Sequence, residues 1–191
     1  MTETTINTIS LDELPFAIRS FVLRWGDMGG QWGVNRTVSQ IHALLYITER
    51  PLHAEEIAAT LGVARSNVSN SLKELQAWKI IERVPVSGDR RDHFTAQTDV
   101  WEMAARIAAV RKEREFDPAL KTLSECLLTA EGDRYVSDVQ RDRLKALYDF
   151  TASIESWHSQ VLKLPASTLT TLVKMGDRVV GLLGLGAKKT S

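Results

Sequence analysis

The sequence predicts a mainly α-helical fold that contains one small β-hairpin, and two observations lead to this prediction. Residues 52–95 read as two short amphipathic helices around a tight turn, followed by a hairpin with glycine and arginine at its tip. After Ala96 the chain has helical periodicity and few strand signals. We therefore expect a winged helix-turn-helix head with a small β-hairpin wing in residues 1–97, followed by a helical dimerisation and effector region in residues 98–191.

Two helices are expected ahead of this motif. The first runs from Leu11 to about Met28, where apolar side chains recur at helical spacing. A glycine-rich stretch is expected to break it and to form a helix-to-helix connection, because no strand precedes it and no Gly-Lys-Ser/Thr follows, as a phosphate-binding loop would require. The second helix holds Val38 to Ile47 and ends before Pro51. The breaking glycines are Gly26, Gly29, Gly30 and Gly33.

The helix-turn-helix is predicted from apolar spacing on two short segments. In the first, from Ala54 to Leu61, apolar residues recur at helical spacing, and Gly62 supplies a stop because glycine tolerates the left-handed conformation that ends helices. The second segment runs from about Arg65 to Trp78. Its apolar residues form one face, made of Val68, Leu72 and Leu75.

The opposite face of the second segment predicts contacts to DNA. Its short hydrogen-bonding groups and cations suit base edges and phosphates. The alternative is an ordinary solvated face, but such faces favour Glu, Lys and Gln, because Ser and Asn are poor helix formers. We therefore favour DNA reading. The candidate residues are Arg65, Ser66, Asn67, Ser69, Asn70 and Lys73.

The wing is predicted directly after this helix. Residues 81–86 alternate like a strand, and Ser87-Gly88-Asp89 has turn chemistry. Cations then follow at and just after the hairpin tip, and they are candidates for DNA contact: Arg90, Arg91 and His93. The alternative is a charged tip that keeps the hairpin soluble, with Asp89 and Asp92 pairing the arginines.

The sequence resembles the MarR-type regulators and, within them, the GbsR-like branch. The resemblance covers nearly the whole chain and is carried by WGDMGGQWGVNRTVSQIHALLYI, SNVSNSLKELQAWKI, VPVSGDRRDHF and DVWEMAARIAAVRKEREFDPAL. The resemblance implies a homodimeric bacterial repressor or activator, and it implies that a small molecule alters the affinity of this protein for DNA. One position departs from the pattern: Ala64 stands where such proteins usually open the recognition helix with serine. The lost N-cap oxygen is worth about 0.5–2 kcal/mol, unless Ser66 caps a helix that starts later.

Composition is compatible with this resemblance. The formal net charge of zero argues mildly against a nucleic-acid binder. However, residues 64–94 carry six Lys or Arg against four Asp or Glu, a net of +2, whereas residues 1–63 carry four against seven, a net of −3. The excess positive charge therefore coincides with the second helix and the wing. Because it is small, we expect two such surfaces to act together in a dimer.

No membrane, secretion or enzyme chemistry is predicted. The polar N-terminus lacks the apolar core of a signal peptide, and the single cysteine, Cys126, fits a reducing cytosol, where we expect it buried beside Leu123 and Leu127. We therefore expect a cytoplasmic protein. None of the four histidines pairs with a cysteine or carboxylate at a metal-ligand spacing, and no catalytic constellation stands out. We therefore expect no metal, no cofactor and no catalysis.

Beyond Ala96 four helices are expected, over about 99–116, 118–130, 133–164 and 167–183, with Asp117 capping before Pro118. In the GbsR-like branch some members respond to quaternary ammonium compounds, for which an aromatic box is the expected receptor. The alternative, which we favour, is that these aromatic side chains fill the joint between head and dimer helices. The candidate box is Trp25, Trp32, Trp101 and Tyr148.

The sequence thus predicts a homodimeric transcriptional regulator on palindromic double-stranded DNA, with a small-molecule effector as a further expectation. The alternative is a winged-helix module that binds protein without sequence-specific DNA binding. Near-zero net charge suits that alternative. It should expose Leu, Phe or Met on the second helix of the motif, where this chain places Ser, Asn and Arg.

Overall fold

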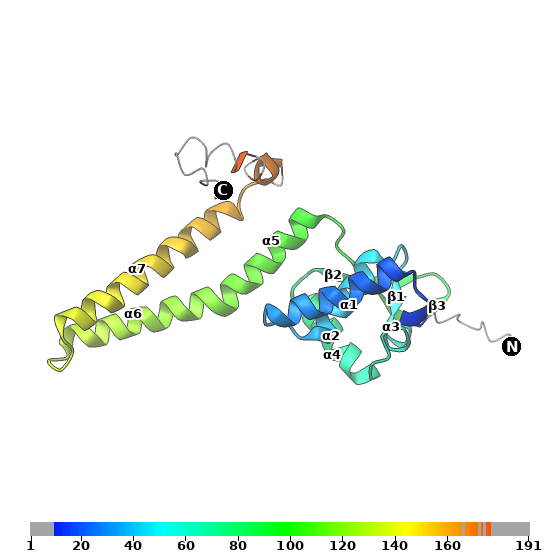
Figure 1. Ribbon diagram of the computed structural model, residues 1–191, viewed down its shortest axis with the longest axis horizontal. Coiled ribbons are helices and arrows are strands. Elements are labelled where there is room, and N and C mark those ends of the chain that lie inside the picture. The colour runs from blue at the N-terminus through cyan, green and yellow to red at the C-terminus, as the bar shows by residue number, and fades with distance from the viewer. Residues whose placement is uncertain (1–9, 166, 172, 174, 177–191) are drawn as a thin grey trace, which may run out of the picture. The chain divides into compact units, whose positions relative to one another are not determined.

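The computed structural model describes residues 10–165, 167–171, 173 and 175–176, and it divides the chain into two compact units. The first unit extends to Ile107 and the second begins at Ala108 (Figure 1). The first unit holds α1 to α4 and all three strands; the second holds α6 and α7, and helix α5 crosses the boundary. The fold is mainly helical with one small antiparallel sheet, as predicted.

Two helices open the first unit, after a short 3-10 turn at Leu11–Glu13. They are α1 (Phe16–Gln31) and α2 (Arg36–Ile47). The Asn35 side chain caps α2 by accepting a hydrogen bond from the Thr37 backbone N–H at 2.8 Å. Most of α2 is buried, so it lies at the centre of the head.

The expectation that glycines break the first helix was wrong, because α1 continues through three of them to Gln31. A Cβ atom on Gly26 would lie less than 3.0 Å from the Gln40 side chain, and one on Gly29 less than 3.0 Å from Ser39. These glycines therefore let α1 and α2 pack closely. Gly33, with a φ of 79°, lies in the connection after the helix ends.

The helix-turn-helix consists of α3 (Ala54–Leu61) and α4 (Arg65–Ala77). Gly62 ends α3 in the left-handed conformation, at a φ of 64°. Helix α4 begins at Arg65, and Ala64 occupies its N-cap without a side-chain hydrogen bond. The helix therefore does not start later with Ser66 as its cap.

A three-stranded antiparallel sheet completes the head. Strands β2 (Ile81–Val86) and β3 (Asp89–Ala96) form the predicted wing, with an irregularity between Val84 and Val86. The sequence did not predict β1 (Leu52–His53), which pairs with β3 and puts it in the middle of the sheet. This pairing sets His53 opposite His93.

The core of the head gathers apolar side chains from every element of the motif. Val68, Leu72 and Leu75 of α4 are buried as predicted, beneath α2 and α3. Met103 of α5 (Val100–Arg111) joins the same core, and the Arg106 guanidinium donates to the Lys79 carbonyl oxygen. The first half of α5 is therefore packed as part of the head.

In the second unit, α6 (Asp117–Gly132) and α7 (Asp138–Val161) lie side by side (Figure 1). Ser137 caps α7 in a reciprocal capping box with Gln140. The Arg141 side chain donates to the carbonyl oxygens of Ala130 at 2.9 Å and Asp133 at 3.1 Å, which satisfies the C-terminal end of α6. The loop between α6 and α7 is therefore fixed at one end by the Ser137 capping box and at the other by the hydrogen bonds from Arg141.

A helix break with Asp117 as cap was predicted before Pro118 and is not found. A π-helical turn (Lys112–Phe116) connects α5 to α6, and Asp117 itself has helical dihedral angles. We attribute the continuity to the wider π turn, which accommodates the proline ring and its missing N–H. The Asp117 carboxylate instead pairs with Lys112 at 2.6 Å.

Two further expectations meet the structure in the second unit. Cys126 is exposed, so its predicted burial was wrong, whereas Leu123 and Leu127 are half-buried. Of the predicted helix over 167–183, residues 167–171 are described and helical, and most of the remainder lies outside the described residues. No helix among the residues that the structure describes is long and apolar enough to cross a membrane.

Candidate nucleic-acid interface

The candidate surface begins on α4, whose buried apolar face leaves the opposite face open. Five of the predicted contact residues on this helix are exposed, and Ser69 is half-buried. No acidic side chain stands between Arg65 and Lys73 in the sequence. Hydroxyl, amide and cationic groups are therefore presented together over the first turns. The exposed residues are Arg65, Ser66, Asn67, Asn70 and Lys73.

The first residue of α4 is held in place by its neighbours. The Arg65 Nε atom donates to Glu55 Oε1 at 2.8 Å, and its guanidinium also donates to the Ser69 hydroxyl. The hydrogen bond from Arg65 is the main reason that the pKa of Glu55 falls to about 2. Asn67 Nδ2 reaches back to Thr37 Oγ1 on α2 at 3.3 Å. Arg65 and Asn67 are therefore oriented before any ligand arrives.

The wing carries paired and unpaired cations. Arg91 pairs with Asp89, which lowers the pKa of that carboxyl, and Arg83 pairs with Asp92 at 3.2 Å. Within the part of the chain that the structure describes, Arg90 has no ion-pair partner, and neither does Lys73 of α4. The alternative reading of the wing tip, in which aspartates pair the arginines, thus holds for Arg91 and leaves Arg90 available.

A groove of about 320 Å³ lies between α4 and strand β3 of the wing. Its polar lining mixes charges of both signs, and Ala54, Leu72 and Phe94 contribute apolar surface. Because the exposed side chains of α4 and the wing border the same groove, they can contact one ligand at once. The residues that line it are Ala54, Glu55, Arg65, Ser69, Leu72, Lys73, Gln76, Arg91, Asp92 and Phe94.

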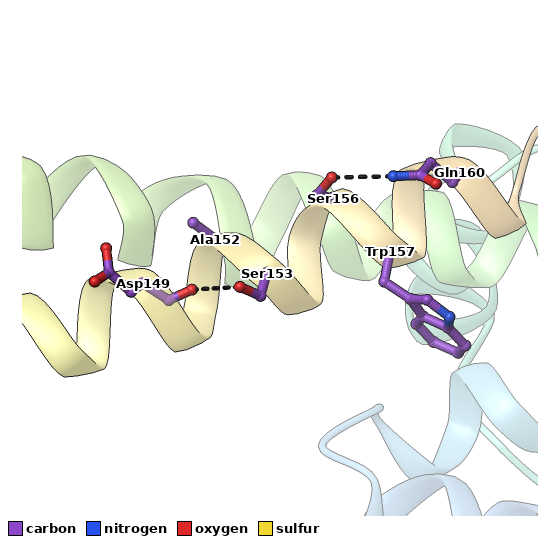
Figure 2. Close-up of a pocket in the computed structure, with 6 residues that line it drawn as sticks. All are labelled: Asp149, Ala152, Ser153, Ser156, Trp157 and Gln160. Carbon is purple, nitrogen blue, oxygen red and sulfur yellow. Dashed lines mark hydrogen bonds between the residues drawn. The ribbon is translucent and has the colours of Figure 1, made fainter.

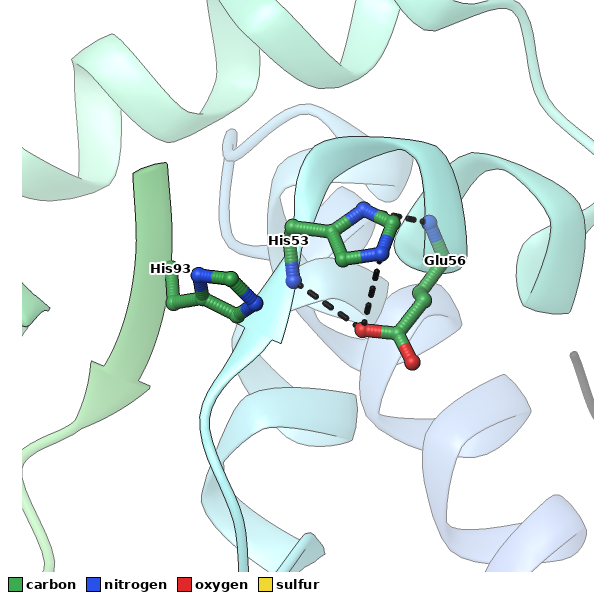
Figure 3. A group of neighbouring side chains, drawn as sticks. All are labelled: His53, Glu56 and His93. Atoms are coloured by element: carbon green, nitrogen blue, oxygen red, sulfur yellow. Dashed lines mark hydrogen bonds and ion pairs between the residues drawn. The ribbon is translucent and has the colours of Figure 1, made fainter. Parts of the chain in front are cut away.

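His93 does not belong to this surface. Its side chain is only 5% exposed, because β3 turns it inward against β1. There its ring meets the His53 ring edge-on, with centroids 5.3 Å apart, and Glu56 lies beside them (Figure 3). We therefore remove His93 from the expected DNA contacts.

The buried carboxylate of this cluster is ionised by its partners. Burial acts to raise the pKa of Glu56, but the hydrogen bonds from Arg50 and from the His53 backbone N–H outweigh burial and lower it. Sequence reasoning missed the cluster because His93 is far from His53 in the chain. The signal that could have found it is the pairing of β1 with β3, which the two-residue length of β1 concealed.

The four aromatic candidates for an effector box are divided between the units. Trp25 packs against Phe21, with ring centroids 5.5 Å apart, at the edge of the head core. Trp32 is 60% exposed, Trp101 is half-buried, and Tyr148 lies on α7 in the second unit. Trp25 is therefore packed within the head.

The fold and this surface define a winged helix with a helical C-terminal part. Residues 32–92, from the end of α1 into β3, match the sequence model of the MarR family. A crystal structure of a transcriptional regulator has a similar fold, with a TM-score of 0.60 at 20% identity over 76% of this chain and 95% of that one. No curated protein matches the chain.

A second solved structure shows a mutant of S. aureus MepR bound to an oligodeoxyribonucleotide. It is 20% identical over 72% of this chain and 90% of that one, with a TM-score of 0.35.

Proposed function

We propose that this protein is a MarR-type transcriptional regulator of the GbsR-like branch, which binds double-stranded DNA through α4 and the wing. The observation that carries the proposal is the exposed face of α4 from Arg65 to Lys73, which holds no acidic residue and borders the same groove as the wing. An α-helix fits the major groove, where amide and guanidinium groups read base edges. Arg65 and Asn70 are the side chains that we assign to bases.

Arg90 is assigned to the DNA backbone. It lies next to the wing tip without an ion-pair partner among the described residues, so it can meet a phosphate without first losing a carboxylate. Arg91 would have to leave Asp89 to do so. We therefore expect Arg90 to contribute more than Arg91 to binding that is independent of sequence.

A homodimer is part of the proposal. With one small basic surface on each chain, two recognition helices about 34–36 Å apart would each enter one half of a palindromic operator. The support is the exposed apolar side of α6 and α7, which a second copy can cover. The division of function between the two regions is also part of the proposal: residues 1–97 bind DNA, and residues 98–191 form the dimer and bind the effector.

The test is DNA binding by fluorescence anisotropy, with duplex from upstream of the protein's own gene and a scrambled duplex of equal length. Arg65→Ala and Asn70→Ala should each weaken specific binding by about 1–3 kcal/mol. Arg90→Ala should weaken both duplexes alike and reduce the salt slope by about 1. Lys121→Ala, which removes an exposed cation from α6, serves as the matched control and should bind as wild type.

Equal binding of both duplexes by the wild type, unchanged by any α4 variant, would contradict the proposal. The protein-interaction module is the reading that such a result would favour.

An effector that alters DNA binding remains a prediction. The exposed Trp32 ring is the member of the aromatic set that a ligand in solution can reach directly. A quaternary ammonium ligand such as choline should raise the melting temperature if it binds the native state. Unchanged melting with choline and betaine would remove this version and leave DNA binding untouched.

A further inference from the structure

Three buried side chains of the head converge at the junction of β1, α3 and β3 (Figure 3). His53 ends β1, and Glu56 lies in the first turn of α3, which follows directly. The register of β1 with β3 brings His93 opposite His53. The ligand atoms of the three side chains lie within 4.8 Å of one another, and each residue is at most 5% exposed.

Hydrogen bonds leave one nitrogen of each imidazole facing the cluster. His93 Nδ1 lies 3.0 Å from the Arg91 carbonyl oxygen. Since a carbonyl oxygen only accepts, Nδ1 carries the hydrogen and Nε2 offers a lone pair. His53 Nδ1 has two neighbours: Glu55 Oε2 at 2.9 Å, and the Glu56 backbone N–H at 3.3 Å. The shorter, charge-assisted contact to the carboxylate places a hydrogen on this nitrogen too.

The remaining nitrogen of His53 is poorly satisfied. Its Nε2 atom is buried and has no hydrogen-bond partner among the described residues, and Glu56 Oε2 lies 3.4 Å away. The Nε2 lone pair of His53 and the Glu56 carboxylate oxygen are both hydrogen-bond acceptors, so neither can satisfy the other. A cation bound between them would offset the cost of burying two unpaired acceptors. Arg50 pairs with the other oxygen of Glu56, Oε1, at 2.8 Å, whereas Oε2 accepts a hydrogen bond from the His53 backbone N–H at 3.2 Å and lies beside the His53 ring.

We propose that His53 Nε2, Glu56 Oε2 and His93 Nε2 bind a divalent transition-metal ion of the zinc type. Two imidazoles and one carboxylate suit Zn²⁺ far better than Mg²⁺ or Ca²⁺, which prefer oxygen ligands. Tetrahedral coordination at about 2.0–2.1 Å separates neighbouring ligand atoms by about 3.3 Å. The 3.4 Å between His53 Nε2 and Glu56 Oε2 agrees with that separation. The His93 ligand atom lies within 4.8 Å of the other two, so an approach of at most about 1.5 Å, away from Asp89 Oδ2 at 3.6 Å from His93 Nε2, would complete the set.

The surroundings provide what a metal-binding histidine requires. A carboxylate commonly holds the other nitrogen of such a histidine and fixes its orientation, and Glu55 does so for His53. The other Glu55 oxygen holds Arg65, the first residue of α4. An ion at this site would therefore link β3 of the wing to the start of α3. Under the proposed function, it would also help to fix the position of Arg65 through Glu55.

The test is a titration of metal-free protein with Zn²⁺ at pH 7.5, by calorimetry and thermal melting. A Cys126→Ser background removes the exposed thiol, which could otherwise bind zinc by itself. We expect one ion per chain with a Kd of about 10 μM or tighter, and a melting temperature that rises with Zn²⁺ concentration. Co²⁺ should give the visible absorption of a tetrahedral nitrogen and oxygen site.

Ligand variants and matched controls locate the ion. His93→Gln and Glu56→Gln should each weaken Zn²⁺ binding by more than about 10–100-fold, the loss typical of removing only a supporting group. His158→Gln removes a histidine from α7, and Arg50→Gln removes the ion-pair partner of Glu56 without removing a ligand; both should still bind one ion. If the ligand variants fail to fold, the Co²⁺ spectrum of the unaltered ligand set decides.

Two results would overturn the proposal. One is the absence of saturable Zn²⁺ binding up to about 100 μM in the Cys126→Ser protein. The other is binding of unchanged strength in both His93→Gln and Glu56→Gln. Because the titration contains no DNA, failure here is distinct from failure of the proposed regulatory function.

Discussion

At the scale of single residues, His42 shows how burial controls charge. Its side chain on α2 is 4% exposed, and its Nε2 atom has no hydrogen-bond partner among the described residues. Burial lowers the pKa of His42 from 6.5 to about 4. The folded protein therefore keeps this imidazole neutral at pH values where the unfolded chain already protonates it.

The consequence is a loss of stability in mild acid. Above about pH 6.5 both states hold His42 neutral, and stability is unaffected by it. As the pH falls from 6.5 toward 4, His42 becomes protonated in the unfolded chain but stays neutral in the folded protein. The free energy of unfolding therefore falls by about 2–4 kcal/mol over this range. Denaturant unfolding of wild type and His42→Gln between pH 7.5 and 4 measures the difference. Parallel curves over this range would show that His42 is not responsible.

At the scale of elements, the packing of α1 on α2 depends on where glycine stands. A Cβ atom on Gly29 would clash with Ser39, whereas one on Gly30 would meet no atom within 4 Å. Two neighbouring glycines of one helix thus have opposite roles: Gly29 permits close approach of the helices, and Gly30 only weakens the helix.

Alanine substitution should separate these roles. Gly29→Ala should destabilise the head by about 1–3 kcal/mol through overpacking, which exceeds the gain of about 1 kcal/mol in helix propensity. Gly30→Ala should stabilise by up to about 1 kcal/mol, since it gains propensity without a clash. Chemical denaturation of the two variants beside wild type gives both signs. Equal effects would mean that the two helices do not approach closely at Gly29.

At the scale of the whole molecule, the second unit exposes more apolar surface than an isolated helix pair can hide. Ala130 is the one residue from 108 onward that is buried among those described. Burying a large apolar side chain is worth about 1.5–3 kcal/mol, so several exposed ones on a helix pair favour an interaction surface. The side chains in question are Leu128, Tyr135, Val139, Leu147, Phe150, Ile154 and Trp157.

One face of α7 illustrates this open surface (Figure 2). Six residues at helical spacing line a shallow pocket of about 600 Å³, and Trp157 within it is 64% exposed. The polar members are bonded along the helix, Ser153 to the Asp149 carbonyl oxygen and Gln160 to Ser156. The polar side chains of this face therefore have hydrogen-bond partners within α7, whereas the exposed Trp157 ring is available to pack against a second copy of the chain.

Self-association should therefore depend on these residues. Light scattering should give twice the chain mass of 21.4 kDa for wild type and the chain mass itself for Phe150→Glu combined with Trp157→Glu. Lys73→Glu, which changes the charge by the same total amount but on α4, should leave the mass unchanged. A wild-type monomer that still protects a palindromic site would contradict the dimer.

The sequence by itself determined the elements of the head. The period of apolar residues and the stop at Gly62 are local signals, so α3 and α4 were predicted close to their observed bounds. The polar character of the exposed α4 face was also predicted from the sequence. Because Val68, Leu72 and Leu75 are buried, the side chains on the opposite side of the helix face solvent.

Only the tertiary structure decided what depends on contacts between distant residues. Local spacing could not show that Gly29 meets Ser39, so the glycines were taken as breaks when they are packing sites. His93 was read as a wing cation, because the pairing of β3 with a strand of two residues leaves almost no signal in the sequence. That pairing buries His93 beside His53. The physical reason is that side-chain environment is set by long-range packing, whereas periodicity reports only which face of an element turns inward.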